Sequence, residues 1–210
     1  MSGKTIDYKK EFKELYMPGA NPILVNVPPI NFIMVDGGGD PNSSEFEKAV
    51  ELLYGLSFAI KMSKMKGNQP EGYFEYVVPP LEGLWWIDGC DFSFEQRENW
   101  RWTAMIRQPE FVTPEVFAWA CSELSRKKPE LSCQGARFET FAEGLCVQAM
   151  HLGPYATEPE TMLKVTAFMA ANNLTDLVGK GGKHHEIYLS DPRKAKPEGM
   201  KTVLRHPVRG

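Results

Sequence analysis

A glutamate and a tyrosine lie two residues apart in the segment HHEIYLSDP, residues 184–192, which alternates in the manner of a strand. Successive side chains of a strand point to opposite faces, so Glu186 and Tyr188 share one face while Ile187 lies on the other. Such a glutamate is either a polar group on a solvated face or a carboxylate held in a pocket. A poorly hydrated pocket carboxylate attracts cations and can act as a base near neutral pH.

Aromatic, acidic and sulfur-containing side chains elsewhere could complete a pocket around this glutamate. Flat rings and adaptable methionines suit small-molecule pockets, and the chain contains five Trp, seven Tyr, twelve Phe and ten Met. We predict Glu186 and Tyr155 as the catalytic candidates. The predicted ligand-binding residues are Glu186, Tyr188, Tyr155, Trp85, Trp86, Glu75, Trp102, His151 and Met34.

Several of these residues have an equally simple structural role. Tyr155 follows a Gly-Pro turn, where its hydroxyl could donate to a ligand carbonyl or cap the local backbone. His151 is in most settings a satisfied structural imidazole. Trp102 either walls a cleft or packs in the core. Because Trp85 and Trp86 are adjacent, only one of them can face a given side of a strand.

Metal and cofactor sites are not indicated by the sequence. His184 and His185 are sequential, so on a strand their rings point in opposite directions and cannot chelate one ion. The glycines at 37–39 lack the spacing of a dinucleotide fingerprint or a P-loop and are better explained by a turn. Four scattered cysteines form no C-x-x-C pair and are expected to be reduced: Cys90, Cys121, Cys133 and Cys146.

Composition limits the classes of partner. With 24 basic and 27 acidic residues the net charge is -3, which gives no electrostatic footprint for nucleic acid. No apolar run approaches the roughly 18 residues of a membrane span, and the charged, amphipathic start lacks a signal-peptide core. We therefore expect a cytoplasmic protein that binds neither nucleic acid nor membrane.

The first half of the chain has the predicted order strand, helix, strand, strand. Ser44, with Glu47 three residues later, forms a capping-box pattern that predicts the start of the helix. The predicted strands lie at 31–36, 73–80 and 100–109, and LEGLWWIDG between the last two is predicted as a loop.

The second half repeats this order after a connecting helix, which begins at the cap Thr113 with Pro114 in its first turn. A pair of strand segments broken near Gly144 comes next, then a helix opened by the capping box of Thr157 and Glu160. The strands HHEIYLSDP and MKTVLRHPV complete the second half.

Three local correspondences in the same order indicate an internal duplication. MVDGGGDP matches MHLGPYAT, FEYVVPP matches HEIYLSDP, and TAMIRQP matches TVLRHP, so Glu75 corresponds to Glu186. We predict one α+β domain over residues 1–210, built from tandem strand-helix-strand-strand modules. Its antiparallel sheets are expected to be related by a pseudo-twofold axis and to enclose a central ligand cleft, because ligands favour such junctions. The boundaries are about 22–110 for module one, about 113–126 for the connecting helix and about 136–208 for module two.

Several of these segments carry a family resemblance over nearly the whole chain. The sequence is similar to the stand-alone branch of the GyrI-like small-molecule-binding family in HEIYLSDPRK, KTVLRHPV, HLGPY, PPLEGLWWID and NFIMVDGGGDPN. The resemblance implies the fold of the effector-binding domains of multidrug-responsive regulators, with Glu186 as the pocket glutamate. The two modules leave no length for a helix-turn-helix domain, so direct gene regulation is not expected.

The resemblance also implies the function. The first expectation is a stand-alone protein that binds lipophilic, aromatic or cationic small molecules and protects against drugs or toxins. The alternative is a cyclopropanoid hydrolase that opens the cyclopropane ring of DNA-alkylating natural products, with Glu186 activating water and Trp85 and Trp86 in its pocket. A protein-binding adaptor is a third class, whose partner the sequence does not name.

Overall fold

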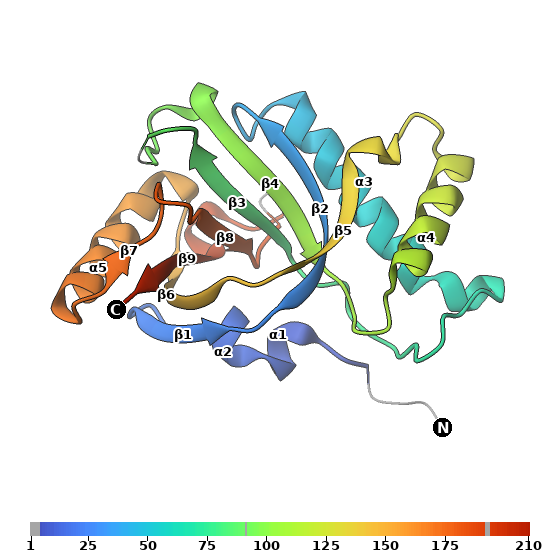
Figure 1. Ribbon diagram of the computed structural model, residues 1–210, viewed down its shortest axis with the longest axis horizontal. Coiled ribbons are helices and arrows are strands. Elements are labelled where there is room, and N and C mark those ends of the chain that lie inside the picture. The colour runs from blue at the N-terminus through green and yellow to red at the C-terminus, as the bar shows by residue number, and fades with distance from the viewer. Residues whose placement is uncertain (1–4, 91, 192–193) are drawn as a thin grey trace.

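The fold was established from a computed structural model that describes residues 5–90, 92–191 and 194–210. Within them the chain forms five α-helices and nine strands (Figure 1). The helices are α1 (Tyr8–Glu11), α2 (Lys13–Tyr16), α3 (Ser44–Lys61), α4 (Pro114–Lys127) and α5 (Glu158–Ala171). The strands are β1 (Ile23–Val27), β2 (Ile30–Gly38), β3 (Leu81–Ile87), β4 (Trp100–Arg107), β5 (Ala136–Phe141), β6 (Gly144–Leu152), β7 (Thr175–Asp176), β8 (His184–Tyr188) and β9 (Lys201–Arg209).

The strands form one antiparallel sheet in the order β1-β6-β9-β8-β3-β4-β2-β5, with β7 added beside β9. From the central β3–β8 pair outward, one half reads β3-β4-β2 and the other β8-β9-β6. Each half is a strand-helix-strand-strand module, with α3 in the first and α5 in the second. The predicted α+β duplication with pseudo-twofold symmetry is therefore confirmed.

The two modules exchange their leading strands. β1 precedes β2 in the chain but pairs with β6 of the second module. β5 precedes β6 but pairs with β2 of the first module. Each module thus closes the outer edge of the other, which leaves fewer unpaired backbone groups at the sheet edges and ties the halves together.

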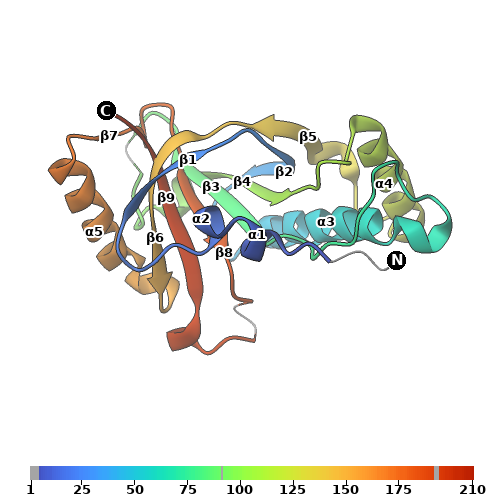
Figure 2. The same ribbon diagram turned by 90° about the horizontal axis from the view of Figure 1, so that it is seen from below.

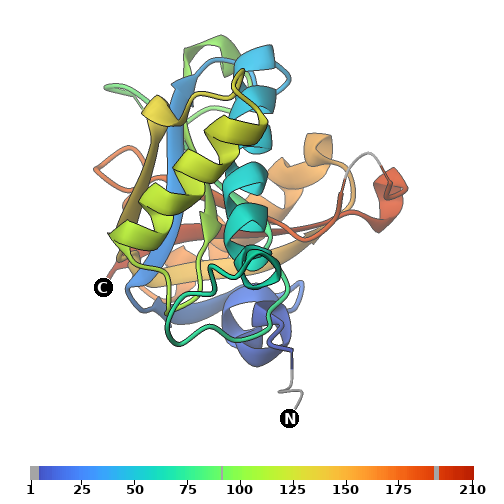
Figure 3. The ribbon, with the colours of Figure 1, turned by 90° about the vertical axis from the view of Figure 1, so that its right-hand side faces the viewer.

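The helices divide between the two faces of the sheet. On one face α3 covers the β2–β4 half, and α5 covers the β6–β9 half, as their separate apolar clusters indicate. On the other face α1 and α2 cover a third cluster that spans both modules (Figure 2). The connecting helix α4 packs beside α3 and extends the first module (Figure 3). The junction of the modules on the α3/α5 face is consequently the place where side chains of both halves meet.

The caps explain where the main helices begin. The side chain of Thr113 accepts a hydrogen bond from the amide of Val116, as predicted. At α3 the N-cap is Ser43, which accepts from the amide of Phe46, so the predicted cap at Ser44 is wrong by one residue. Thr157 does not cap the amides of α5, because its hydroxyl donates to the carbonyl of Pro154.

The third strand of module one lies later in the chain than predicted. Residues 73–80 form no strand. Tyr76 makes only an isolated bridge to Ile6, and the prolines at 79 and 80 lack the amide donors that a strand needs. The strand is LEGLWWI, which we predicted as a loop. It is buried on both faces, and its sequence does not alternate between polar and apolar residues. Glu75, the predicted counterpart of Glu186, therefore lies outside the sheet, and the glutamate of β3, Glu82, is on the face opposite to Glu186 because it pairs with Ile187.

Candidate functional site

Glu186 lies at the junction of the modules on the α3/α5 face. In the central pair its direct cross-strand partner is Gly83, while Trp85 pairs with His184 on the same face. The residue is only 6% exposed, so the alternative of a solvated glutamate on an open sheet face does not apply.

Two aromatic side chains meet beside this carboxylate. The indole Nε1 of Trp85 donates a hydrogen bond of 3.1 Å to the hydroxyl of Tyr188. The ring of Tyr188 in turn meets that of Tyr155 edge-to-face, with centroids 6.0 Å apart. Burial and the nearby charge of Glu186 raise the pKa of both tyrosines, so both hydroxyls remain protonated donors at neutral pH.

A second carboxyl group accompanies Glu186. Glu158, the first residue of α5, is buried, and its Oε1 has no hydrogen-bond partner among the described residues. Burial, followed by the charge of Glu186, raises the pKa of Glu158 well above its usual range, while Arg97 opposes the shift. The site therefore combines a neutral carboxylic acid with a second carboxyl group, which is the usual composition of an acid–base pair.

Three further polar residues extend from Glu186 to the edge of the sheet. Nε2 of His184 lies 3.1 Å from Oε1 of Glu186, and Nδ1 of His184 lies 2.7 Å from Nε2 of His206. Nδ1 of His206 lies 2.8 Å from Oδ2 of Asp176 on β7. Burial lowers the pKa of His184, and hydrogen bonding to His206 lowers that of Asp176 although burial opposes it.

The loop between β3 and β4 covers this chain of polar residues. Phe92 stacks on the ring of His184 with centroids 4.8 Å apart, and Phe94 meets the same ring edge-on at 5.4 Å. These contacts exclude water from His184. A surface hollow of about 620 Å³ lies elsewhere, beside Asp88, Trp100 and Arg101, and is not lined by Glu186.

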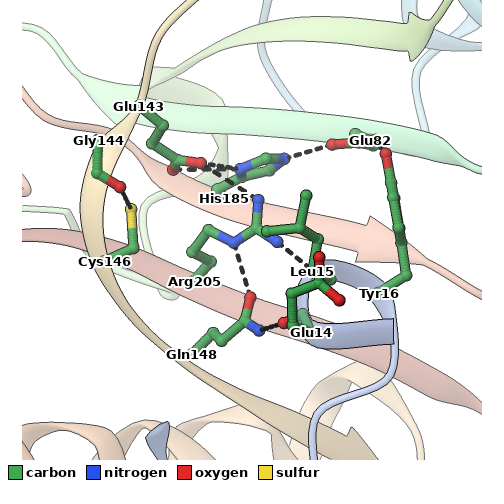
Figure 4. Close-up of polar contacts among 10 residues, drawn as sticks. All are labelled: Glu14, Leu15, Tyr16, Glu82, Glu143, Gly144, Cys146, Gln148, His185 and Arg205. Carbon is green, nitrogen blue, oxygen red and sulfur yellow. Dashed lines mark hydrogen bonds and ion pairs between the residues drawn. The ribbon is translucent and has the colours of Figure 1, made fainter. Parts of the chain in front are cut away.

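The opposite face of the central pair carries a different charged network (Figure 4). His185 points away from His184, as the strand alternation predicted, and its Nε2 lies 3.0 Å from Oε2 of Glu82. Its Nδ1 lies 3.0 Å from Oε2 of Glu143, which also accepts from Nη1 of Arg205. The two carboxylates raise the pKa of His185 to about 8 against the effect of its burial.

This network joins the N-terminal helices to the sheet (Figure 4). Tyr16 of α2 donates to Glu82. Arg205 donates to the carbonyl of Leu15 and to the side chain of Gln148, which donates to the carbonyl of Glu14. Since these partners satisfy its members from both sides, the network is a structural device rather than an open site.

The structure brings some of the predicted site residues together. Glu186, Tyr188, Tyr155 and Trp85 lie in mutual proximity. Trp102 pairs with Trp85 on the same face but is fully buried under α3, next to Phe46.

His151 shares this face and holds the turn that presents Tyr155. Its Nδ1 lies 2.9 Å from Oγ1 of Thr161, and its Nε2 lies 3.1 Å from the carbonyl of Pro154. Both ring nitrogens are thus engaged with the turn and with α5, which is the structural alternative considered for this residue.

Three predicted residues lie away from the site. Trp86 points to the opposite face, where the ammonium of Lys183 lies 3.7 Å from its ring centroid. Met34 is buried in the core on that same opposite face, because it pairs with Met105 and not with a residue of the Glu186 face. Glu75 lies in the loop before β3 and forms a surface ion pair with Lys64.

Glu158, His184, His206 and Asp176 were not among the predicted site residues. Glu158 lies between the two residues of the predicted capping box, and the other three come from segments whose contact depends on the pairing of β7, β8 and β9. A cluster of three or more residues suited to hold a metal ion is not found within the described part of the chain. Across the same residues, no helix combines the length and apolarity needed to span a membrane.

Residues 20–209 match the model of the GyrI-like small molecule binding domain family. The chain therefore belongs to this family, as the sequence resemblance implied. No curated protein matches the chain.

Solved structures show the same relationship. An uncharacterized conserved protein from Listeria innocua is 49% identical, with a TM-score of 0.94 over 98% of this chain and 100% of that one. A hydrolase from Listeria innocua is 47% identical, with a TM-score of 0.90 and the same coverage. The C-terminal domain of EcmrR is 12% identical with a TM-score of 0.55, over 90% of this chain and 96% of that one, and shares the fold alone.

Proposed function

We propose that this protein is a hydrolase of small lipophilic electrophiles and that its reaction centre is Glu186. The observation that carries the proposal is the pairing of this buried glutamate with a neutral acid, Glu158, beside two protonated tyrosines. A likeness of 47% identity over 98% of the chain to a protein described as a hydrolase supports the same reading.

The proposed substrate class is a cyclopropane-bearing alkylator whose strained ring is conjugated to a carbonyl group. The aromatic residues Tyr155, Tyr188 and Trp85 would pack on a flat lipophilic molecule. Tyr188 and Tyr155 are half-buried, so their rings are the part of the site that such a molecule would reach first.

The reaction adds one water molecule across the strained bond. Glu186 takes a proton from water as the water oxygen bonds to a ring carbon, and the ring C–C bond breaks. The electron pair of the broken C–C bond passes to the carbonyl oxygen, which receives a proton from Tyr155. Glu158 is a further proton donor at the site. Glu186 then gives up its proton, which restores the protonated tyrosine through solvent.

Binding without chemistry is the second candidate function. A single buried carboxylate amid aromatic rings is sufficient to bind a lipophilic cation. The half-buried tyrosines at the site are compatible with such a role. In that case Glu186 supplies only charge, and the protein lowers the free concentration of its ligand stoichiometrically.

The test is turnover of a cyclopropane-bearing alkylator, followed by its chromophore. We expect many turnovers with the wild-type protein. Glu186→Gln is expected to lower the turnover rate at least 100-fold, since a general base contributes about 10² to 10⁴-fold to a rate. Glu75→Gln is the matched control and is expected to retain wild-type activity, because Glu75 lies in a surface ion pair.

Two outcomes separate the candidate functions. Loss of the chromophore change in all three proteins, with quenching of tryptophan fluorescence by benzyltrimethylammonium that disappears in Glu186→Gln, favours binding alone. Equal turnover by the wild-type and Glu186→Gln proteins contradicts the assignment of Glu186.

A further inference from the structure

We propose that Asp176, His206 and His184 form a proton relay that carries to the protein surface the proton taken up by Glu186. The four side chains form an uninterrupted series of three contacts, of 2.8, 2.7 and 3.1 Å. The inference deepens the proposed hydrolase function and rests on it for its kinetic role, while the relay itself can be tested without a substrate.

The number of protons in the relay follows from its contacts. A bare ring nitrogen and a carboxylate oxygen repel one another at such distances, so each of the three contacts must contain one proton. Two ionised carboxylates and two neutral imidazoles would contain only two ring protons. The relay therefore binds one proton more and carries one net negative charge.

That additional proton can lie at either end. In one arrangement Glu186 is ionised, His184 is protonated on Nε2, and His206 is an imidazolium paired with Asp176. In the other, Glu186 is protonated, His184 is protonated on Nδ1, and His206 is neutral. The two arrangements differ only by a shift of two protons along existing hydrogen bonds, and the lowered pKa of His184 disfavours the alternative with a charged central ring.

The positions of the two ends suit a relay. Glu186 is 6% exposed and has little direct contact with water, whereas the side chain of Asp176 is 34% exposed. Between them Phe92 and Phe94 shield His184. A proton taken up by Glu186 thus has a hydrogen-bonded route to solvent that does not cross the ligand site.

Other titratable and charged groups surround the relay and belong to its electrostatic environment. Glu158 and Tyr155 face Glu186 from the start of α5 and from the turn before it, and Lys180 donates to the backbone carbonyl of Asp176. The other titratable or charged groups around the relay are Tyr188, Arg97, His185 and Asp191.

The variant Asp176→Asn interrupts the relay with little change in shape. Oδ1 of Asp176 already accepts a hydrogen bond from the amide of Val178, so the side-chain oxygen of the Asn variant is expected to keep that place. The side-chain NH₂ group of the variant then faces Nδ1 of His206 as a donor. His206 must then lose its Nδ1 proton, and no outward transfer through this atom remains. Asp88→Asn is the matched control, since it removes an equal charge from a surface ion pair with Arg101.

The first measurement needs no substrate. The proposed role of Glu186 as a base requires the arrangement in which Glu186 is ionised. In protein labelled with ¹⁵N-histidine, the ring shifts near pH 7 are therefore expected to show His206 protonated on both nitrogens and His184 on Nε2 alone. In Asp176→Asn, His206 should lose the Nδ1 proton, and in Asp88→Asn nothing should change. Two protons on His184, or a His206 ring unaffected by Asp176→Asn, would overturn the relay. If Asp176→Asn does not fold, the wild-type spectrum decides by itself.

The second measurement is kinetic and uses the cyclopropane-bearing alkylator. We expect Asp176→Asn to complete one turnover per site at the wild-type rate and then to slow at least tenfold, so that kcat and KM fall together and kcat/KM is unchanged. A linear time course at the wild-type rate would refute the kinetic role. Absence of turnover by the wild-type protein would contradict the hydrolase proposal instead, and the histidine spectrum would still decide whether the relay exists.

Discussion

Gly83 and Glu186 are direct partners across the central pair of strands, where the two modules meet. A Cβ atom at Gly83 would lie 2.7 Å from Nε1 of Trp85 and 3.1 Å from the hydroxyl of Tyr188. The absence of a side chain on one strand is therefore what allows the indole and the phenol to meet beside the carboxylate on the other.

Gly83→Ala is expected to displace this pair of aromatic residues. Because Trp85 is almost fully buried, the clash should lower the free energy of unfolding by about 1–3 kcal/mol and weaken turnover at least tenfold. Gly135→Ala is the control, since nothing lies within 4 Å of its added methyl group. Chemical denaturation and chromophore assays of both variants check this, and a fully active Gly83→Ala protein would count against the site.

Glu158→Gln is expected to stabilise the protein at neutral pH. The pKa of Glu158 is higher in the folded state than in the unfolded chain, so this group lowers the stability of the fold once the pH exceeds the pKa of the unfolded chain. The amide of the Gln variant does not titrate and removes this effect. We expect a gain of at least about 1 kcal/mol at pH 7, the equivalent of one pKa unit, and none near pH 4. Glu160→Gln, on the exposed side of the same helix, should change neither value. Equal unfolding free energies for Glu158→Gln and the wild-type protein at pH 7 would contradict a neutral Glu158.

The stability of the protein should fall as the pH rises from about 6.5 to about 8. His185 has its pKa raised to about 8 in the fold, so its stabilising ion pairs are complete below the unfolded value and are lost as the pH passes through the folded value. His185 is expected to contribute about 2 kcal/mol of this loss, in addition to the contribution of Glu158. Urea denaturation of the wild-type and His185→Gln proteins across the range measures the difference. Equal slopes for the two proteins would show that the ring is not charged in the network.

Ser43→Ala and Ser44→Ala test the start of α3. The side chain of Ser43 accepts from the amide of Phe46, so its removal should cost about 1 kcal/mol of unfolding free energy. Ser44 is exposed in the first turn and its removal should change stability by less than about 0.5 kcal/mol. The reverse order, measured by thermal or urea unfolding, would place the cap where the sequence pattern first suggested.

Local patterns were sufficient for much of the fold. The cap Thr113 and the strands β4 and β8 were found from the residues of their own segments, although both strands are buried on both faces. β3 was missed because the apolar run around Gly83 has no period of two. Residues 73–80 alternate without pairing, and only the sheet as a whole determines which of the two segments enters it.

The same distinction applies to the site. That Glu186 and Tyr188 share a face, and that His184 and His185 do not, follows from the two-residue period of a strand. Glu158 and Asp176 come from other elements, so their proximity depends on tertiary packing. The choice between Trp85 and Trp86 needed the register of β3 with β8.

A crystal of the Glu186→Gln variant soaked with the unreacted cyclopropane-bearing alkylator tests the central claim most directly. The account predicts the molecule on the α3/α5 face, with its ring carbon next to residue 186 and its carbonyl oxygen within hydrogen-bond distance of Tyr155. A molecule seated instead in the surface hollow beside Asp88 and Arg101, with the surroundings of residue 186 unchanged, would contradict it.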